Sequence, residues 1–358
     1  MGKRKRNPFC RCFAAGFAVL AAGGPAYAAD AGGHLGLEHK PKKQQSVESV
    51  YRQQNALFKP GQFIIQPGFS YAYSDSNAVT LNGFLALGAI FLGQINVSKV
   101  KSNIETLSLQ TSYSPTDDMQ FALTVPYLAR QSTYESVGVN GSSLQASEQG
   151  VTNKGQIGDV SASFFYQLAG SQTGAALIWN LVAKAPTGRS PYGIPIATQP
   201  QNNNLSYPTA LPTGNGVWSV QTGLSAIKTV NPVILFTSLS YTYEIPRDFG
   251  NISTTTTPTP GRVAPGNAVS VGGGTAFALN RRISLTFSFN ESFIASTSIK
   301  PAGSSWQTVV GSSENAAVLN FGVSYAENAS TTIVSNLGIG LTRDAPNVDL
   351  SFTVPMTF

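Results

Sequence analysis

The side chains that most enzymes use for nucleophilic or acid–base catalysis are scarce in this sequence. It contains two histidines, His34 and His39, and two cysteines, Cys10 and Cys12. Known hydrolases place a histidine beside a serine or an aspartate, and here all four residues fall in a short N-terminal stretch. The sequence also lacks Cys/His sets with metal-ligand spacing. We therefore predict no catalytic site, no cofactor site and no metal site.

Five charged residues stand at positions that the alternation described below assigns to the inside of a pore. They are Arg130, Asp159, Lys184, Glu244 and Asp349, and we predict them as pore-lining residues. In one interpretation they form a constriction that sets ion selectivity. In the other they are solvated or mutually paired charges near the rims of the pore. Their mixed signs argue against strong selectivity for anions or for cations.

The N-terminus has the order of features typical of a secretory signal peptide. Four basic residues from Lys3 to Arg6 precede an apolar run, Phe13 to Ala22, and the small-residue site Ala26 to Ala28. The alternative is a membrane anchor, but a spanning helix needs about 20 apolar residues, and this run is shorter. We predict that residues 1–28 are a signal peptide.

Removal of this segment changes the charge balance. The full chain has 23 Lys+Arg against 17 Asp+Glu, a net charge of +6. Five of the 23 bases and none of the acids lie in residues 1–28, which leaves 18 bases against 17 acids and a net charge of +1. The remaining chain lacks the basicity of a nucleic-acid-binding protein, so we predict no nucleic-acid partner. Both cysteines also lie in the removed segment, so no disulfide is expected.

Most of the region 60–358 alternates between apolar residues and small or polar ones. Leu107 and Leu109, for example, alternate with Ser108 and Gln110. This period of two is the mark of a β-strand with two different faces. About twelve such stretches follow one another, and we expect their apolar faces to meet lipid and their polar faces to line a lumen.

The lengths of the connections distinguish a membrane barrel from a soluble β-sandwich, which is the alternative fold. Bacterial outer-membrane barrels join an even number of antiparallel strands by short turns on one side and longer loops on the other. The short connections are 114–118, 169–174, 229–232, 280–282 and 327–331. The long ones are 74–106, 135–156, 186–215, 246–265 and 298–313. We therefore predict an all-β protein, an antiparallel transmembrane β-barrel of about twelve strands, in contact with outer-membrane lipid and with both termini in the periplasm.

A separate element precedes the barrel. Residues 29–44 are small, polar and basic and are interpreted as a periplasmic linker. In residues 45–59, an apolar stripe at helical spacing ends at a Pro-Gly pair. The stripe consists of Val47, Val50, Tyr51, Leu57 and Phe58. We predict a short helix that plugs the lumen, the alternatives being a helix that lies on the membrane surface and one that frays in the periplasm.

Several long motifs resemble one known family. They are Thr80–Gly93, Gly155–Val160, Lys184–Gly193, Leu211–Val220, Trp306–Gly311 and Asn336–Pro346. The chain from about Val47 to Phe358 resembles the outer-membrane transporter family named for the meta-pathway of phenol degradation, and within it the FapF-like branch of functional-amyloid export channels. This resemblance implies a twelve-stranded, helix-gated barrel, assembled as a homotrimer, that secretes unfolded amyloid subunits. Residues 31–43 depart from that branch, because they carry no heptads for its periplasmic coiled coil.

Three functions follow as hypotheses. The first, and the main prediction, is a channel that exports unfolded amyloid-type polypeptides through a helix-gated pore. The second is a passive pore for the uptake of small solutes, aromatic or apolar. The third is a structural or adhesin-like barrel whose loops bind partners. None of the three is an enzyme.

Overall fold

A computed structural model describes residues 50, 59–77, 81–85, 90–95, 99–136, 147–170, 175–198, 205–253 and 257–358. The predicted signal peptide and linker lie outside the described residues, as does the predicted plug helix apart from Val50 and Lys59. All described residues belong to one compact unit, Lys43–Phe358. Within this part of the chain, no helix has the length and hydropathy that a transmembrane helix requires.

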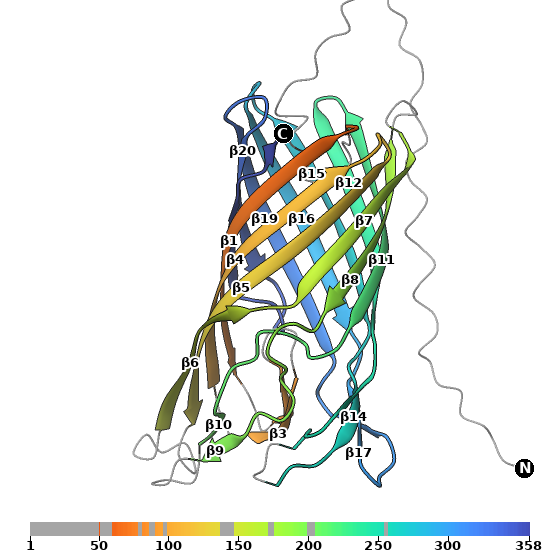
Figure 1. Ribbon diagram of the computed structural model, residues 1–358. Coiled ribbons are helices and arrows are strands. Elements are labelled where there is room, and N and C mark those ends of the chain that lie inside the picture. Colours follow the sequence, from red (N-terminus) through yellow and green to blue (C-terminus); the bar gives the residue numbers. More distant parts are fainter. Residues whose placement is uncertain are drawn as a thin grey trace, which may run out of the picture. The chain divides into compact units, whose positions relative to one another are not determined.

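The described residues form a closed antiparallel barrel with twelve strand positions (Figure 1). Ten positions are held by single strands: β1 (Gln62–Asn77), β4 (Lys99–Ser114), β5 (Met119–Ser136), β8 (Ala176–Ala185), β11 (Ser219–Val230), β12 (Val233–Glu244), β15 (Ala268–Ala278), β16 (Ile283–Ile294), β19 (Glu314–Ala326) and β20 (Thr332–Gly340). The other two are each shared by a pair: β6 (Ser147–Ile157) with β7 (Val160–Ala169), and β21 (Val348–Thr353) with β22 (Met356–Thr357). Pairing of β1 with β21 and β22 closes the ring. The predicted fold class and strand number are confirmed.

The connections sort by length as the sequence predicts. One end of the barrel, the turn end, carries the short turns, and two of these turns are each held by an asparagine. The side-chain Oδ1 of Asn280 accepts hydrogen bonds from the backbone N–H groups of Arg282 and Ile283 at 2.8 and 2.9 Å. Asn328 does the same for Ser330 and Thr331 at 2.8 and 2.9 Å. These Asx turns explain why the chain reverses at these points.

The opposite end, the loop end, is more structured than the sequence predicts. Strands β1 and β4 continue through much of the predicted loop 74–106, and β6 occupies part of the predicted loop 135–156. Short strands form three small sheets in the other long connections: β2 (Leu81–Leu85) with β3 (Ile90–Ile95), β9 (Ile196–Thr198) with β10 (Ser206–Pro208), and β13 (Arg247–Phe249), β14 (Gly261–Ala264), β17 (Ser298–Pro301) and β18 (Gln307–Thr308) together. These long connections therefore contain short strands that the alternation of the sequence does not predict.

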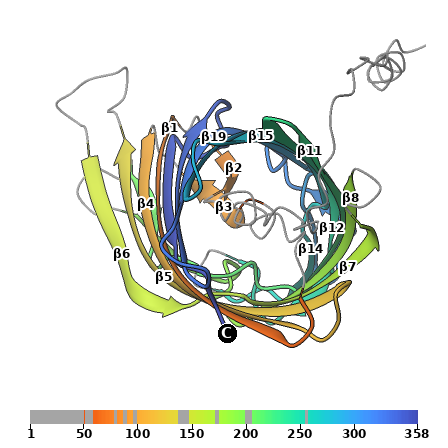
Figure 2. The ribbon, with the colours of Figure 1, turned by 90° about the horizontal axis from the view of Figure 1, so that it is seen from above.

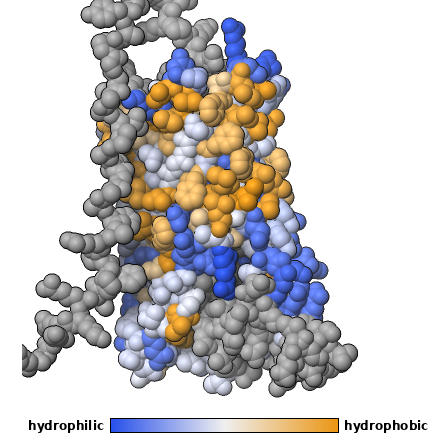
Figure 3. Space-filling view, turned by 180° about the vertical axis from the view of Figure 1, so that it is seen from behind, coloured by the Kyte–Doolittle hydropathy of each residue, from blue (hydrophilic) through white to orange (hydrophobic). Residues whose placement is uncertain are grey.

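The outer face of the barrel carries a belt of exposed apolar side chains, seen as an orange band in Figure 3. Adjacent strands place aromatic rings side by side in this belt. Phe287 packs edge-on against Phe277 at 6.4 Å and against Phe321 at 5.4 Å between ring centroids, and such pairs contribute about 0.5–1.5 kcal/mol each. A soluble protein cannot leave such a continuous belt exposed. A closed barrel with this belt is a transmembrane barrel of the bacterial outer membrane.

One position in the wall is discontinuous. Strand β7 pairs with β8 and with the start of β5, whereas β6 pairs with the far half of β5 and with no other strand among the described residues. The break falls at Gly158 and Asp159, opposite Pro126, which has no N–H group to donate to a neighbouring strand. Beyond this break β6 bends away from the ring (Figure 2).

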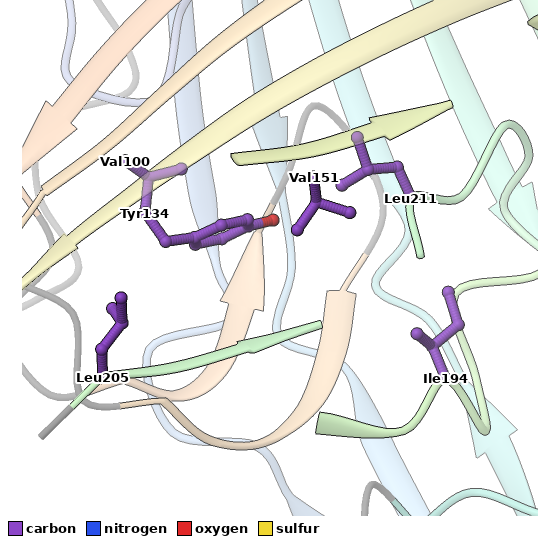
Figure 4. Close-up of a cluster of buried hydrophobic side chains, with 6 residues drawn as sticks. All are labelled: Val100, Tyr134, Val151, Ile194, Leu205 and Leu211. Atoms are coloured by element: carbon purple, nitrogen blue, oxygen red, sulfur yellow. The ribbon is translucent and has the colours of Figure 1, made fainter. Parts of the chain in front are cut away.

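A segment between β8 and β11 packs against the diverging strands. We call it the strap; its described residues are 186–198 and 205–217. Figure 4 shows the buried cluster beneath it, in which Leu205 and Leu211 of the strap lie near Tyr134 of β5 and Val151 of β6. Tyr134 is completely buried, and full burial of one such apolar side chain contributes about 1.5–3 kcal/mol. The strap therefore seals the wall where β6 and β8 separate.

Candidate functional site

Small polar side chains cover most of the lumen wall. Ser102 and Ser132 share a hydrogen bond at 3.0 Å, and Ser270 and Ser292 share one at 2.8 Å. Each pair comes from neighbouring strands, since the even-numbered residues of these strands point inward. Short hydroxyl side chains keep the passage wide and provide hydrogen-bonding groups for water or for a solute.

A cavity of ≈ 340 Å³ lies at the loop end of the lumen. Its wall combines the inward residues at the loop ends of seven strands with residues from the loops above them. The lining residues are Ser161, Val182, Lys184, Tyr192, Asn215, Ser219, Gln221, Thr242, Glu244, Pro265, Gly266, Ala268, Ile294, Thr297, Ser312 and Glu314. The strand ends and loops thus form a pocket of small-molecule size on one side of the barrel mouth.

Two of the predicted pore-lining residues meet in this cavity. Lys184 and Glu244 both line it, and they attract each other. Glu244 is 8% exposed and also interacts with the Asn215 side chain by a hydrogen bond. The ring of Tyr192 packs on Phe249 at 4.7 Å between centroids, and burial raises the pKa of its phenol well above the usual value, so the phenol remains neutral.

Asp159 does not face the open lumen as a strand residue, because it lies in the break between β6 and β7. Its carboxylate accepts two backbone hydrogen bonds from the strap, from Gly188 N–H at 3.0 Å and from Asn215 N–H at 2.7 Å. Thr213 adds a further link: its Oγ1 donates to the Ile157 carbonyl at 3.0 Å. Asp159 thus has a structural position that fastens the strap to the wall.

Arg130 also contacts the strap. It points inward from β5 but is only 5% exposed, and its Nη1 donates a hydrogen bond to the Pro212 carbonyl at 2.7 Å. Asp349 is on β21, which β1 and β4 separate from β5 in the ring, and it does not line the loop-end cavity. The five predicted residues therefore do not form one constriction. Two line the cavity, two hold the strap, and one stands apart.

The turn end of the lumen has an apolar patch on one side of its wall, on the adjacent strands β7, β8, β11, β12 and β15, and we call this patch the collar. Ala176, Ile178, Ile227, Ile234 and Ala276 form a buried cluster there, flanked by Phe165 and Phe236. Val50, the one described residue from the apolar stripe of the predicted plug helix, is helical, 1% exposed and part of this cluster. The other stripe residues, Val47, Tyr51, Leu57 and Phe58, lie outside the described residues.

Sequence reasoning missed most residues of the cavity, among them Glu314, Tyr192 and Thr297. Glu314 has the same parity as the lumen residue Asn320, so extending that alternation toward the N-terminus would have found it. Tyr192 and Thr297 lie in loops without periodicity, and no local signal assigns their side chains to the lumen.

Comparison with known proteins agrees on the fold. A search against protein-family models gave no match. The crystal structure of an outer membrane channel from Pseudomonas putida F1 is similar, with a TM-score of 0.52 and 14% identity over 90% of this chain and 100% of that one. The translocator domain of the autotransporter NalP from Neisseria meningitidis gives a TM-score of 0.41 and 8% identity, covering 88% and 96% of the two chains. The monoaromatic hydrocarbon channel CymD gives 0.42 and 10%, covering 84% and 88%. Only the first likeness is strong enough to argue from, and it concerns the fold alone.

Proposed function

We propose that this barrel is a passive outer-membrane channel for the uptake of small molecules with aromatic or apolar bodies. The observation that carries the proposal is the order in which different kinds of side chain line the lumen from the loop end to the turn end. A cavity large enough for a small molecule lies at the loop end, hydroxyl side chains line the lumen wall, and the apolar collar lies on one side of the turn end. Short turns face the periplasm in such barrels, so the cavity faces the outside.

The collar favours apolar solutes over hydrated ions. Ile178, Ile234 and Phe236 give an aromatic or aliphatic solute an apolar surface to pass along, and this surface offers a hydrated ion no hydrogen-bonding groups. An aromatic or aliphatic body loses nothing at the same place. The cavity has apolar lining as well, from Val182, Ile294 and Pro265.

The burial of Val50 supports a gate at the collar. A buried helical residue among lumen-facing side chains fits a helix held inside the barrel rather than one on the membrane surface. In this proposal the helix over residues 45–59 docks on the collar and limits flow until it is displaced. A helix of this length is marginal in water on its own, which makes reversible docking plausible on energetic grounds.

Export of unfolded amyloid-type polypeptides, implied by the resemblance, finds no specific support among the described residues, and the same holds for a homotrimer. A pocket of ≈ 340 Å³ in the lumen wall matches a small solute in size. The solute pore is therefore the function that the geometry supports best.

Liposome swelling tests this proposal. Vesicles containing the purified barrel should swell in an isosmotic solution of phenyl β-D-glucoside, a neutral aromatic solute that lipid bilayers pass only slowly, faster than in raffinose, and removal of residues 29–58 should increase the phenyl β-D-glucoside rate several-fold. Swelling no faster than in protein-free vesicles, with and without the deletion, would contradict the proposal.

A further inference from the structure

The loop-end cavity carries an unbalanced set of charged side chains. Its lining includes two glutamates, Glu244 and Glu314, against one lysine, Lys184. Glu244 stands at the end of β12, Glu314 at the start of β19 and Lys184 near the end of β8. The three side chains approach the cavity from different parts of the wall, and acidic groups outnumber basic ones.

Glu244 is buried with part of its hydrogen-bonding capacity unused. Asn215 binds its carboxylate, Lys184 attracts it and Asp159 repels it. The carboxylate is 8% exposed, and its Oε2 atom has no hydrogen-bond partner among the described residues. A buried carboxylate oxygen without a donor is costly, so a ligand that brings a donor to this point would gain affinity.

Thr297 is a second, independent observation at the same cavity. Its side chain is completely buried and lines the cavity, and its Oγ1 has no hydrogen-bond partner in the described part of the chain. Its backbone is fixed on both sides: the N–H donates to Ser312 Oγ, and the carbonyl accepts from Val309 N–H, both at 2.9 Å. These two hydrogen bonds use the N–H and carbonyl groups of Thr297, and they fix the backbone that carries the hydroxyl at the cavity wall.

The rest of the lining sets the shape of the partner. Val182, Ala268 and Ile294 contribute apolar surface beside the two unsatisfied oxygens. The volume of ≈ 340 Å³ is at the lower end of the range for small-molecule sites, about 300–1,000 Å³. A protonated primary amine supplies three N–H donors and a positive charge, and a short hydrocarbon body would cover the apolar part.

We infer that the loop-end cavity binds small organic amines, with the ammonium group against Glu244 and Thr297 and the apolar body against Val182 and Ile294. Glu314 is the second acidic side chain in the wall of this cavity. The inference rests on the proposed pore, for which it names a substrate class. Binding itself, however, is a property of the cavity and can be measured without transport.

Isothermal titration calorimetry on the full-length protein in detergent tests binding directly. Phenethylammonium is the probe, and 2-phenylethanol and 3-phenylpropionate are its neutral and anionic counterparts. We expect phenethylammonium to bind at least tenfold more tightly than either. Equal binding of the three, or binding of Mg²⁺ that displaces phenethylammonium at equal concentration, would overturn the inference in favour of a water-filled cavity or a metal site.

Variants locate the site. Glu244→Gln keeps the size of the side chain and should weaken phenethylammonium binding at least tenfold, and Thr297→Val should weaken it several-fold. Glu314→Gln provides a second measurement if the buried Glu244→Gln variant fails to fold. Asp349→Asn is the matched control, because it removes a lumen carboxylate outside this cavity and should leave binding unchanged. Wild-type affinity in both glutamine variants, or equal weakening in the control, would overturn the assignment.

Solute passage into liposomes separates this inference from the proposed function. If phenethylammonium binds but the barrel passes no solute, the pore proposal fails and the amine site remains. If the barrel passes the neutral aromatic solute but the cavity binds phenethylammonium and 2-phenylethanol equally, the pore proposal remains and the amine site is wrong.

Discussion

The backbone N–H of Asn215 donates a hydrogen bond of 2.7 Å to Oδ2 of Asp159, which joins the strap to the break in the barrel wall. The other carboxylate oxygen holds Gly188 in the same strap. The Asp159 side chain thus binds the strap at two points, Gly188 and Asn215, where the strap covers the gap between β6 and β8. The first two predictions concern this bridge.

Asp159→Ala should loosen the strap without unfolding the barrel. Hydrogen bonds to a charged group contribute about 1.5–3 kcal/mol each, and the substitution removes two of them. Hydrogen exchange in residues 205–217 should accelerate at least tenfold while strands such as β16 remain protected. Asp248→Asn, a change at an exposed loop-end carboxylate, is the control. Unchanged exchange in Asp159→Ala would mean that the buried cluster around Tyr134 holds the strap by itself.

Gly214→Ala should have a similar local effect for a steric reason. A Cβ atom at Gly214 would overlap the Asp159 carboxylate, so one of the two must move. Gly150 on β6 has open space at its Cβ position, which makes Gly150→Ala the matched control. We expect proteolysis within the strap of Gly214→Ala and intact protein for Gly150→Ala, assayed by limited digestion of the detergent-solubilised barrel.

Leu285 and Thr286 should report opposite environments. In β16 they pair with Val323 and Gly322 of β19, and Thr286 points to the lumen side, where it lies near the Cβ position of Gly322. A cysteine at 285 should react with a lipid-soluble thiol reagent, and one at 286 with a water-soluble reagent. If both reacted only with the water-soluble reagent, the register or the membrane position of this strand would be wrong.

Val50→Asp should open the proposed gate. The substitution places a carboxylate inside the apolar collar, where an unpaired charge is costly, so the helix should dissociate. Single-channel conductance in planar bilayers should rise several-fold, as it should after deletion of residues 29–58. The same substitution at Val310, which is 78% exposed, is the control and should conduct like wild type. Identical conductance of all four proteins would place the gate elsewhere.

The barrel could be predicted from the sequence because a strand with lipid on one side and water on the other must alternate at every residue. Lys184 and Glu244 were assigned to the lumen by the same parity, and the structure places both in the cavity. The same parity assigns Asp159 to the lumen, although Gly158 and Asp159 interrupt the ladder.

The loop-end sheets could not be predicted for a different reason. Val263 pairs with Ile299 across a long stretch of sequence, in strands of four residues each. Strands this short show too few alternations to stand out, and their partners are known only once the barrel has brought them together. Thr297 belongs to the same region and was missed for this reason.

The seam that closes the ring differs from the other ladders. β1 pairs with β4 along its entire length, from Gln62 to Asn77, but with β21 only from Gly68 to Tyr73 and with β22 only at Ile64 and Ile65. Two prolines, Pro67 and Pro355, lie at the point where this ladder is interrupted. The seam joins the two ends of the sheet, which are furthest apart along the chain, and so has the highest entropic cost of closure. The barrel should therefore form as a curved, open sheet first, and β1 and β21 should pair last. Until they pair, the assembling barrel has a lateral opening between these two strands that faces the membrane.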